Sequence, residues 1–214
     1  MAARPTVFLD RDGTLIREVP YLASVEQAEL LPGVAEALAG LHRAGAQLIV
    51  VSNQSGIARG LLDDGDLLAI QHKIDAGLEA LGARIDGFYH CPHPPSVGVP
   101  PQRRRCRCRK PLPGLLERAA QDFEIDWSRS AGVGDDVRDL QAFAAMKIPS
   151  VLVGTGKGRQ ARQKLAELGK DPDLYAGHLA EAVPWLLHQT GLTRARERHP
   201  KSAHGCGDLA AVAC

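Results

Sequence analysis

The chain has 214 residues, 44% of them hydrophobic and 24% charged, with a net charge of +1 at pH 7. This composition is typical of a globular protein with one domain and a sizeable core. No stretch approaches the roughly 18 consecutive apolar residues of a membrane span, and no apolar signal segment precedes the first predicted strand, so we expect a cytoplasmic protein without a membrane partner.

The first predicted element is a buried strand over Thr6–Leu9, which ends in two carboxylates one residue apart. Asp10 and Asp12 would lie at the carboxyl edge of a sheet, where open α/β sheets bind their ligands. Two carboxylates so close repel each other unless a cation lies between them or one holds a proton. The stretch therefore indicates a divalent metal, a nucleophile paired with an acid, or only a turn, since Asp and Gly are common turn residues.

Helices and strands alternate over the rest of the chain. Helices are predicted over 32–44, 63–81, 111–123 and 138–146, and buried strands over 47–52, 85–90, 130–133 and 150–153. A polar helix and an amphipathic helix over 178–188 follow. Strands separated by helical segments are typical of βαβ units, so we expect an α/β fold with a Rossmann-like parallel sheet and helices on both faces.

The loop that follows the third predicted strand contains two pairs of potential metal ligands. Cys91 and His93 form the first pair, and Cys106 and Cys108 form the second. Three thiolates and one imidazole suit a closed, tetrahedral structural zinc site, here across residues 91–108. A disulfide or idle thiols are the alternatives, and disulfides are rare in the cytosol.

Positive charge is concentrated in the same loop. Six of the eight residues from Arg103 to Lys110 are basic, and the other 20 basic residues are outnumbered by 25 acidic ones. So narrow a concentration suits an anionic small molecule better than a nucleic acid, which needs a broader basic face. With four Phe, two Trp and three Tyr, the chain is also poorly supplied for base stacking, so we expect no nucleic-acid partner.

The last residues break the alternating pattern. We expect one domain over residues 1–191, followed by a disordered C-terminal extension over 192–214, because that segment shows little periodicity. Cys206 and Cys214 in the extension are most simply unpaired thiols.

Polar groups follow two further strands. Ser52-Asn53-Gln54-Ser55-Gly56 ends the second strand, and Gly134-Asp135-Asp136 ends a later one, with Asp139 close behind. Lys110 precedes a proline-started helix, near a favourable place for an anion. Each group alone has an ordinary explanation, a turn or a helix N-cap, but their coincidence at strand ends predicts one site.

In order, Asp10-Arg11-Asp12-Gly13-Thr14, Ser52, Lys110 and Gly134-Asp135 resemble the four motifs of the haloacid dehalogenase-like phosphatase superfamily, over about residues 6–155. The resemblance implies a minimal cap, Asp10 as nucleophile and Asp12 as general acid and base. It also implies that Ser52 and Lys110 bind the transferring phosphoryl group. Catalytic Mg²⁺ would be held by Asp10, Asp135 and the main-chain carbonyl of Asp12.

Within the superfamily, the zinc loop and the segments 52–60, 108–111 and 155–157 resemble the D-glycero-D-manno-heptose 1,7-bisphosphate 7-phosphatases. That family removes the C7 phosphate on the way to ADP-heptose and the lipopolysaccharide core. The resemblance implies a small phosphorylated sugar as partner, and substrate contacts from Glu18, Val19, Pro20, Tyr21, Ser52, Asn53, Gln54, Ser55, Arg109 and Lys110. Asp136 departs from the pattern, because some members have a lysine there that touches substrate.

Two alternatives remain open. Histidinol-phosphate phosphatases share the zinc loop, but they usually have Asn-Gln-Asp-Gly where residues 53–56 are Asn-Gln-Ser-Gly. A catalytically idle, zinc-stabilised binding protein could also keep the fold, although the intact Asp10, Asp12, Lys110 and Asp135 argue against it. We expect the chain to be a monomer.

Overall fold

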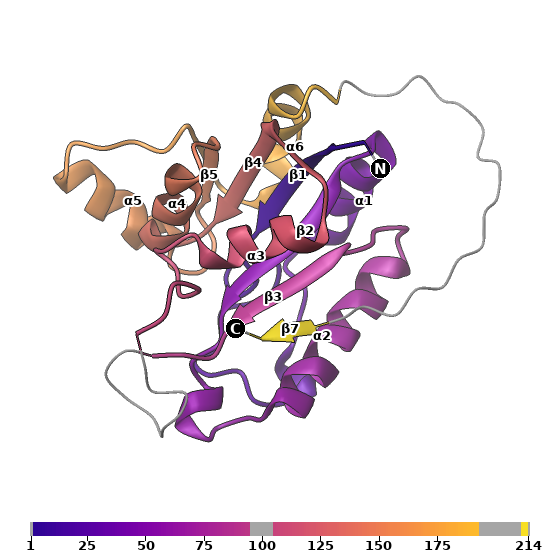
Figure 1. Cartoon of the computed structure of the whole chain (residues 1–214), viewed down its shortest axis with the longest axis vertical. Helices are drawn as coiled ribbons and strands as arrows, with labels where there is room; N and C mark the ends of the chain where they lie inside the picture. Colours follow the sequence, from indigo (N-terminus) through magenta and orange to yellow (C-terminus); the bar gives the residue numbers. More distant parts are fainter. Residues whose placement is uncertain (1, 95–104, 193–210, 214) are drawn as a thin grey trace.

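The structure is a computed structural model that describes residues 2–94, 105–192 and 211–213. Within these ranges, one parallel sheet has the strand order β6-β5-β4-β1-β2-β3-β7 (Figure 1). The strands are β1 (Arg4–Leu9), β2 (Gln47–Asn53), β3 (Gly87–Cys91), β4 (Ile125–Gly134), β5 (Ser150–Val153), β6 (Leu174–Ala176) and β7 (Ala211–Ala213). The helices are α1 (Val34–Ala44), α2 (Asp64–Glu79), α3 (Gly114–Asp122), α4 (Val137–Ala145), α5 (Gly158–Glu167) and α6 (Leu179–Gln189), with 3-10 turns η1 (Val25–Gln27) and η2 (Ile57–Arg59).

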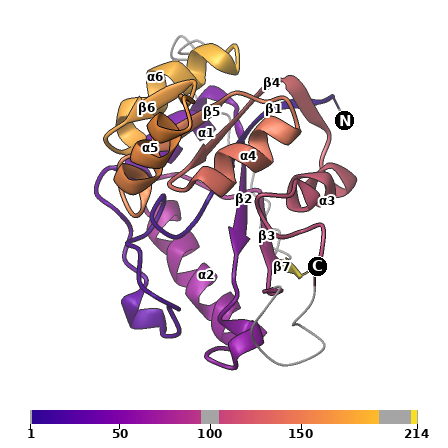
Figure 2. The same ribbon diagram turned by 90° about the vertical axis from the view of Figure 1, so that its left-hand side faces the viewer.

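Helices cover both faces of the sheet, as the sequence predicted (Figure 2). Successive side chains of a strand point to opposite faces, and β1 shows the result. Val7 and Leu9 join the core formed with α1, α2 and α6, whereas Phe8 joins the core formed with α3 and α4. Both faces of the central strands are buried, which explains why these strands are continuous apolar runs.

The order of the strands decides where a ligand can bind. The chain passes from β1 to β2 and β3 on one side, and returns to β4, β5 and β6 on the other. This reversal next to β1 is a topological switch point, outside which open α/β sheets bind their ligands. The main-chain N–H of Asp10 donates to the Val133 carbonyl at 2.9 Å, so the ends of β1 and β4 are joined at this point.

The structure differs from the predicted elements at the edges of the fold. The strand predicted over 130–133 extends from Ile125, and β6 was not predicted. The predicted polar helix is α5, a helix of ten residues. Residues 211–213 form β7, which pairs in parallel with β3, whereas the domain boundary and the disordered extension stay predictions.

Some predictions fall on residues that are not described. Arg103, Arg104 and most of the residues between the two ligand pairs lie outside the described residues, as do Cys206, Cys214 and most of the predicted extension. Among the helices that are described, none combines the length and the hydropathy that a membrane crossing requires.

Candidate active site

A cavity of about 410 Å³ opens at the carboxyl edge of the sheet. Its lining contains every residue predicted for catalysis, magnesium or substrate: Asp10, Asp12, Glu18, Val19, Pro20, Tyr21, Ser52, Asn53, Gln54, Ser55, Arg109, Lys110 and Asp135. These residues come from the ends of β1, β2 and β4 and from the loops between elements. The fold thus brings together side chains that are up to 125 positions apart, from Asp10 to Asp135.

Lys110 is the buried centre of this site. Its ammonium donates to Asp10 Oδ1 at 2.5 Å and to the Val51 carbonyl at 2.7 Å, and it lies 2.7 Å from Asp139 Oδ1. Three acceptors match the three protons of an ammonium group. The side chains of Lys110, Asp10 and Asp139 are no more than 10% exposed, so they form a charged cluster in a medium of low dielectric constant.

The cluster contains more negative than positive charge. Burial alone would lower the pKa of Lys110, but the carboxylates of Asp10 and Asp139 outweigh it and raise that pKa, so the lysine stays protonated. Burial raises the pKa of Asp10 well above its usual range, with Lys110 opposing and Asp139, Asp135 and Asp12 adding repulsion. Burial likewise raises the pKa of Asp135 to about 7. A bound cation would relieve this repulsion.

Oxygens of Asp10, Asp135 and Asp139 lie within 4.8 Å of one another and could hold a metal ion. The backbone leaves room for Asp135 by means of glycine. A Cβ on Gly13 or on Gly156, both in the left-handed region at φ +83° and +53°, would lie 2.1 Å from Asp135 Oδ2. The same oxygen accepts the main-chain N–H of Lys157 at 2.7 Å, so Asp135 is held from two sides.

Asp12 is fixed by four donors. Arg11 donates from Nε and Nη2 to its two carboxylate oxygens at 3.2 and 3.0 Å, a bidentate arrangement that gives geometric specificity. Gln54 Nε2 donates to Oδ2 at 2.6 Å, and Ser52 Oγ does so at 3.5 Å. Asp12 is therefore oriented toward the end of β2, on the cavity side of β1.

Asn53 connects Lys110 to β2. Its side-chain amide donates to the Lys110 carbonyl at 3.1 Å, and its carbonyl oxygen accepts the Lys110 main-chain N–H at 3.1 Å. The sequence predicted Asn53 and Gln54 as substrate contacts. In the structure both line the cavity, and both also bond to catalytic candidates, Asn53 to Lys110 and Gln54 to Asp12.

Four further basic side chains line the cavity. Arg138 is paired with Asp136 at 2.7 Å, and Lys157 is paired with Glu18. Among the described residues, Arg109 and Arg59 have no carboxylate within ion-pair distance, and Arg109 Nη1 is buried without a hydrogen-bond partner. Asp136, which departs from the family pattern, thus has its charge balanced by Arg138 and also caps α4.

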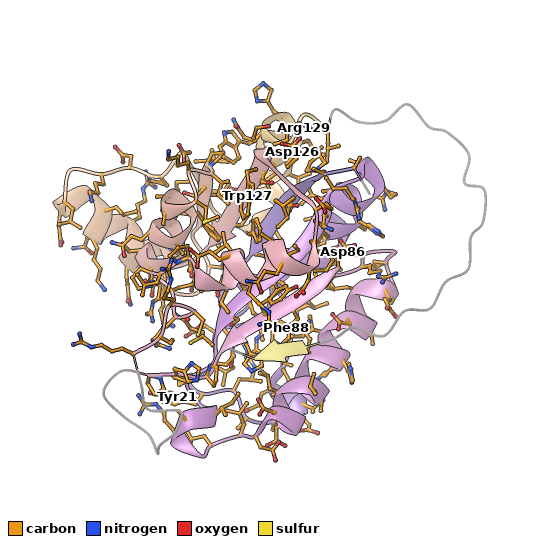
Figure 3. The ribbon with its side chains drawn as sticks, in the orientation of Figure 1. Tyr21, Asp86, Phe88, Asp126, Trp127 and Arg129 are labelled. Carbon is orange, nitrogen blue, oxygen red and sulfur yellow. The ribbon has the colours of Figure 1, made fainter. Side chains whose placement is uncertain are left out.

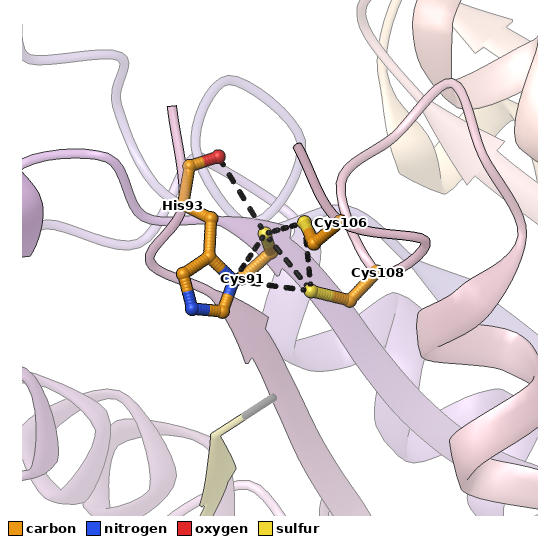
Figure 4. Close-up of side chains that lie close together, drawn as sticks. All are labelled: Cys91, His93, Cys106 and Cys108. Atoms are coloured by element: carbon orange, nitrogen blue, oxygen red, sulfur yellow. Dashed lines mark hydrogen bonds between the residues drawn. The ribbon is translucent and has the colours of Figure 1, made fainter. Parts of the chain in front are cut away.

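The two predicted ligand pairs converge beside the end of β3 (Figure 4). Cys108 Sγ lies 3.2 Å from Cys91 Sγ and 3.1 Å from Cys106 Sγ, and His93 Nδ1 lies 3.4 Å from Cys108 Sγ. The sulfur–sulfur separations far exceed the roughly 2.05 Å of a disulfide, so these three sulfurs are not bonded to one another. The hydrogen bond from Cys108 lowers the pKa of Cys91 to about 6, against burial, which favours the thiolate that a metal needs. These four residues could hold a metal ion.

Sequence reasoning missed part of the site. Asp139 was noted only as part of a carboxylate cluster, because its position three residues after Asp136 is also that of a capping box. The structure shows both roles, since Asp139 Oδ2 accepts the Asp136 N–H at 3.0 Å while Oδ1 faces Lys110. Arg59 and Arg138 also line the cavity. Arg59 lies in the segment 52–60 that carries the family resemblance, but neither arginine was assigned a role from the sequence.

Comparison with known sequences gives relatives of named activity. Residues 107–182 match the family model described as "HAD-hyrolase-like". The D-glycero-beta-D-manno-heptose-1,7-bisphosphate 7-phosphatase of Photorhabdus laumondii is 41% identical over 154 residues, which span 72% of this chain and 82% of that protein.

Solved structures give the same pattern. The structure of a D,D-heptose 1,7-bisphosphate phosphatase from B. bronchiseptica, complexed with magnesium and phosphate, has a TM-score of 0.74 and 35% identity, and covers 86% of this chain and 98% of that one. A putative HAD-like phosphatase from Mesorhizobium loti has a TM-score of 0.76 and 28% identity, with 92% and 91% covered.

Proposed function

We propose that this chain hydrolyses the C7 phosphate of D-glycero-D-manno-heptose 1,7-bisphosphate with the aid of Mg²⁺. The chain belongs to the family of D-glycero-D-manno-heptose 1,7-bisphosphate 7-phosphatases. The observation that carries the proposal is the buried contact between Lys110 and Asp10 beside Asp135, at the switch point of the sheet. The product of the proposed reaction, a heptose 1-phosphate, would serve ADP-heptose and lipopolysaccharide core synthesis.

The donor set at Asp10 fits a magnesium ion. Three buried carboxylates lie together, and two of them contact the single Lys110 ammonium. Oxygen ligands are those that Mg²⁺ prefers. We assign Asp10, Asp135 and the main-chain carbonyl of Asp12 as ligands. Both oxygens of Asp139 already have partners, so Asp139 orients Lys110 instead. When bound, Mg²⁺ would supply positive charge that reduces the repulsion between an anionic nucleophile and an anionic phosphate.

In the first step, a carboxylate oxygen of Asp10 attacks phosphorus. Lys110 occupies Oδ1, and no described residue donates to Oδ2, which is therefore the free oxygen. The O–P bond to Asp10 forms while the bond from phosphorus to the C7 oxygen breaks. The departing alkoxide takes a proton from Asp12, and Lys110 and Ser52 bind the phosphoryl oxygens.

In the second step, Asp12 removes a proton from water and so activates it toward the aspartyl-phosphate. The bond from the water oxygen to phosphorus forms while the bond from Asp10 to phosphorus breaks, which releases inorganic phosphate and regenerates the Asp10 carboxylate. Splitting one difficult displacement into two is the usual gain of nucleophilic catalysis. The four donors around Asp12 support this role, because they hold it in one place for both proton transfers.

We also propose that the four Cys and His side chains bind a structural zinc ion. Their donor atoms lie within 4.8 Å of one another, and three sulfurs with one imidazole form a closed zinc set. Cys108 is followed directly by Arg109 and Lys110, so a fixed Cys108 would hold the catalytic lysine in place. A cytoplasmic location would keep the thiols reduced.

Residues 1–191 would form the catalytic domain, because β1 to β6 and all six described helices lie within them. We also propose that a monomer is the active unit. Neither a histidinol-phosphate phosphatase nor an idle binding protein is favoured by the relatives found.

A competition assay tests the proposal. Equal concentrations of heptose 1,7-bisphosphate and histidinol phosphate are offered to the magnesium-loaded enzyme, and both products are followed over time. We expect heptose bisphosphate to be consumed first by a wide margin. Preference for histidinol phosphate, or no phosphate release with Mg²⁺ present, would refute it.

A further inference from the structure

Tyr21 and Arg59 form one wall of the cavity, although they come from different parts of the chain. Tyr21 lies in the loop after β1, and Arg59 ends the 3-10 turn η2 after β2. The Arg59 guanidinium lies 4.8 Å from the centroid of the Tyr21 ring, within the range of a cation–π contact. Figure 3 labels Tyr21 on the side toward which the arrows of β2 and β3 point.

The conformation of Tyr21 is unusual. Its φ is +51°, a left-handed value that bulky residues rarely adopt, and the residue is 48% exposed. Such strained backbone persists where the surroundings hold it, and it gathers at ligand sites. Tyr21 thus combines a strained backbone with an exposed side chain, and one face of its ring lies against Arg59.

The charges around Arg59 indicate an anion. Arg138 and Lys157 have acidic partners, whereas Arg59 and Arg109 have none among the described residues. Both guanidinium groups line the same cavity as Lys110. Arg59 and Arg138 are close enough to help lower the pKa of the half-buried Arg109, after burial itself. Arg59 and Arg109 have no acidic partner among the described residues, so a dianion that binds between them would reduce their mutual repulsion.

We propose that Arg59, held against the Tyr21 ring, binds the phosphate that is not transferred and so selects a bisphosphate over a monophosphate. This inference rests on the proposed function. Lys110 and the carboxylate cluster serve only the phosphate being transferred, so the second dianion needs other cations. The planar guanidinium group can bind two phosphate oxygens at once. Contact with the Tyr21 ring already restricts the Arg59 side chain, so Arg59 loses less conformational entropy when it binds phosphate.

The test compares kcat/KM for heptose 1,7-bisphosphate with kcat/KM for heptose 7-phosphate. Arg59→Ala should lower the value for the bisphosphate by about 10- to 100-fold, the usual range for one charge-assisted contact, and that for the 7-phosphate by less than about threefold. Arg59→Lys should lose most of the same preference, because it keeps the charge but not the fork. Arg43→Ala, which removes an exposed arginine of α1 away from the cavity, is the matched control and should change neither value.

Variants of Tyr21 separate the ring from its hydroxyl. Tyr21→Phe keeps the aromatic ring and should retain the preference for the bisphosphate over the 7-phosphate. Tyr21→Leu removes the ring and should reduce that preference. Equal losses on both substrates in Arg59→Ala, or no loss on either, would overturn the inference while leaving the proposed function intact. A wild-type enzyme that uses both substrates equally well would also overturn the inference, whereas no phosphate release from the bisphosphate would contradict the proposed function.

Discussion

Replacement of Lys110 by methionine tests the charge balance of the buried cluster. Methionine keeps most of the length of the side chain but removes the ammonium that lies 2.5 Å from Asp10 and 2.7 Å from Asp139. Two buried carboxylates then face each other and Asp135 without their cation. Removing one partner of a buried ion pair typically costs about 3–5 kcal/mol of stability, because it leaves an uncompensated charge.

The size of this loss should depend on pH. Asp10 already has a raised pKa from burial and from neighbouring carboxylates, and without Lys110 the pKa rises further. The folded variant then keeps a proton that the unfolded chain releases above a pKa of about 3.9. Stability of the variant therefore falls as the pH rises toward the folded pKa, by up to about 1.4 kcal/mol per pH unit for one proton.

Urea denaturation without Mg²⁺ measures both effects. We expect Lys110→Met to lose about 3–5 kcal/mol relative to the wild type at pH 8, and clearly less at pH 5.5. Lys164→Met, on the exposed side of α5, is the matched control and should lose little at either pH. A loss below about 1 kcal/mol at pH 8, or an equal loss at both pH values, would refute the reasoning.

Four further predictions concern catalysis and metals. Asp12→Asn should lower kcat by roughly 10²–10⁴-fold, since it loses the proton donor; steady-state kinetics near wild-type rates would contradict its role. Because Asp135 has a pKa raised to about 7 and metal ligands must be deprotonated, calorimetric Mg²⁺ affinity should weaken below pH 7, by about tenfold per pH unit for one proton; a constant affinity from pH 6 to 8 would contradict this. Elemental analysis should find one zinc per chain that brief EDTA treatment leaves in place, and less in Cys106→Ser; zinc-free protein purified without chelator would rule out the site. Arg109→Ala and Arg109→Lys should lower kcat/KM for the heptose bisphosphate far more than for a small monophosphate, whereas equal losses would make Arg109 a general support of the site.

The sequence predicted those strands whose two faces are both buried. The runs at Val7–Leu9 and 48–51 are continuously apolar because helices cover them on both sides. The start of β4 was missed because Asp126, Ser128 and Arg129 interrupt the apolar pattern. β6 is only three residues long and partly exposed, so it has too little hydrophobic pattern to be recognised.

The candidate site divides in the same way. Asp10, Asp12 and Asp135 follow apolar strands, so their position at the sheet edge could be predicted from local pattern. Asp139 and Arg59 could not be assigned, because their partners are 29 and 38 positions away, at Lys110 and Tyr21. These pairs meet only in the folded chain, and no local spacing pattern in the sequence predicts such long-range contacts.

The most direct test of the account follows both phosphates of the substrate by ³¹P NMR. Wild-type enzyme with Mg²⁺ and heptose 1,7-bisphosphate should release the C7 phosphate and leave the C1 phosphate on the sugar. Asp10→Asn should leave the substrate unchanged, because an amide is a poor nucleophile and a poor magnesium ligand. Loss of the C1 phosphate, or turnover by Asp10→Asn at a rate near the wild type, would contradict the account.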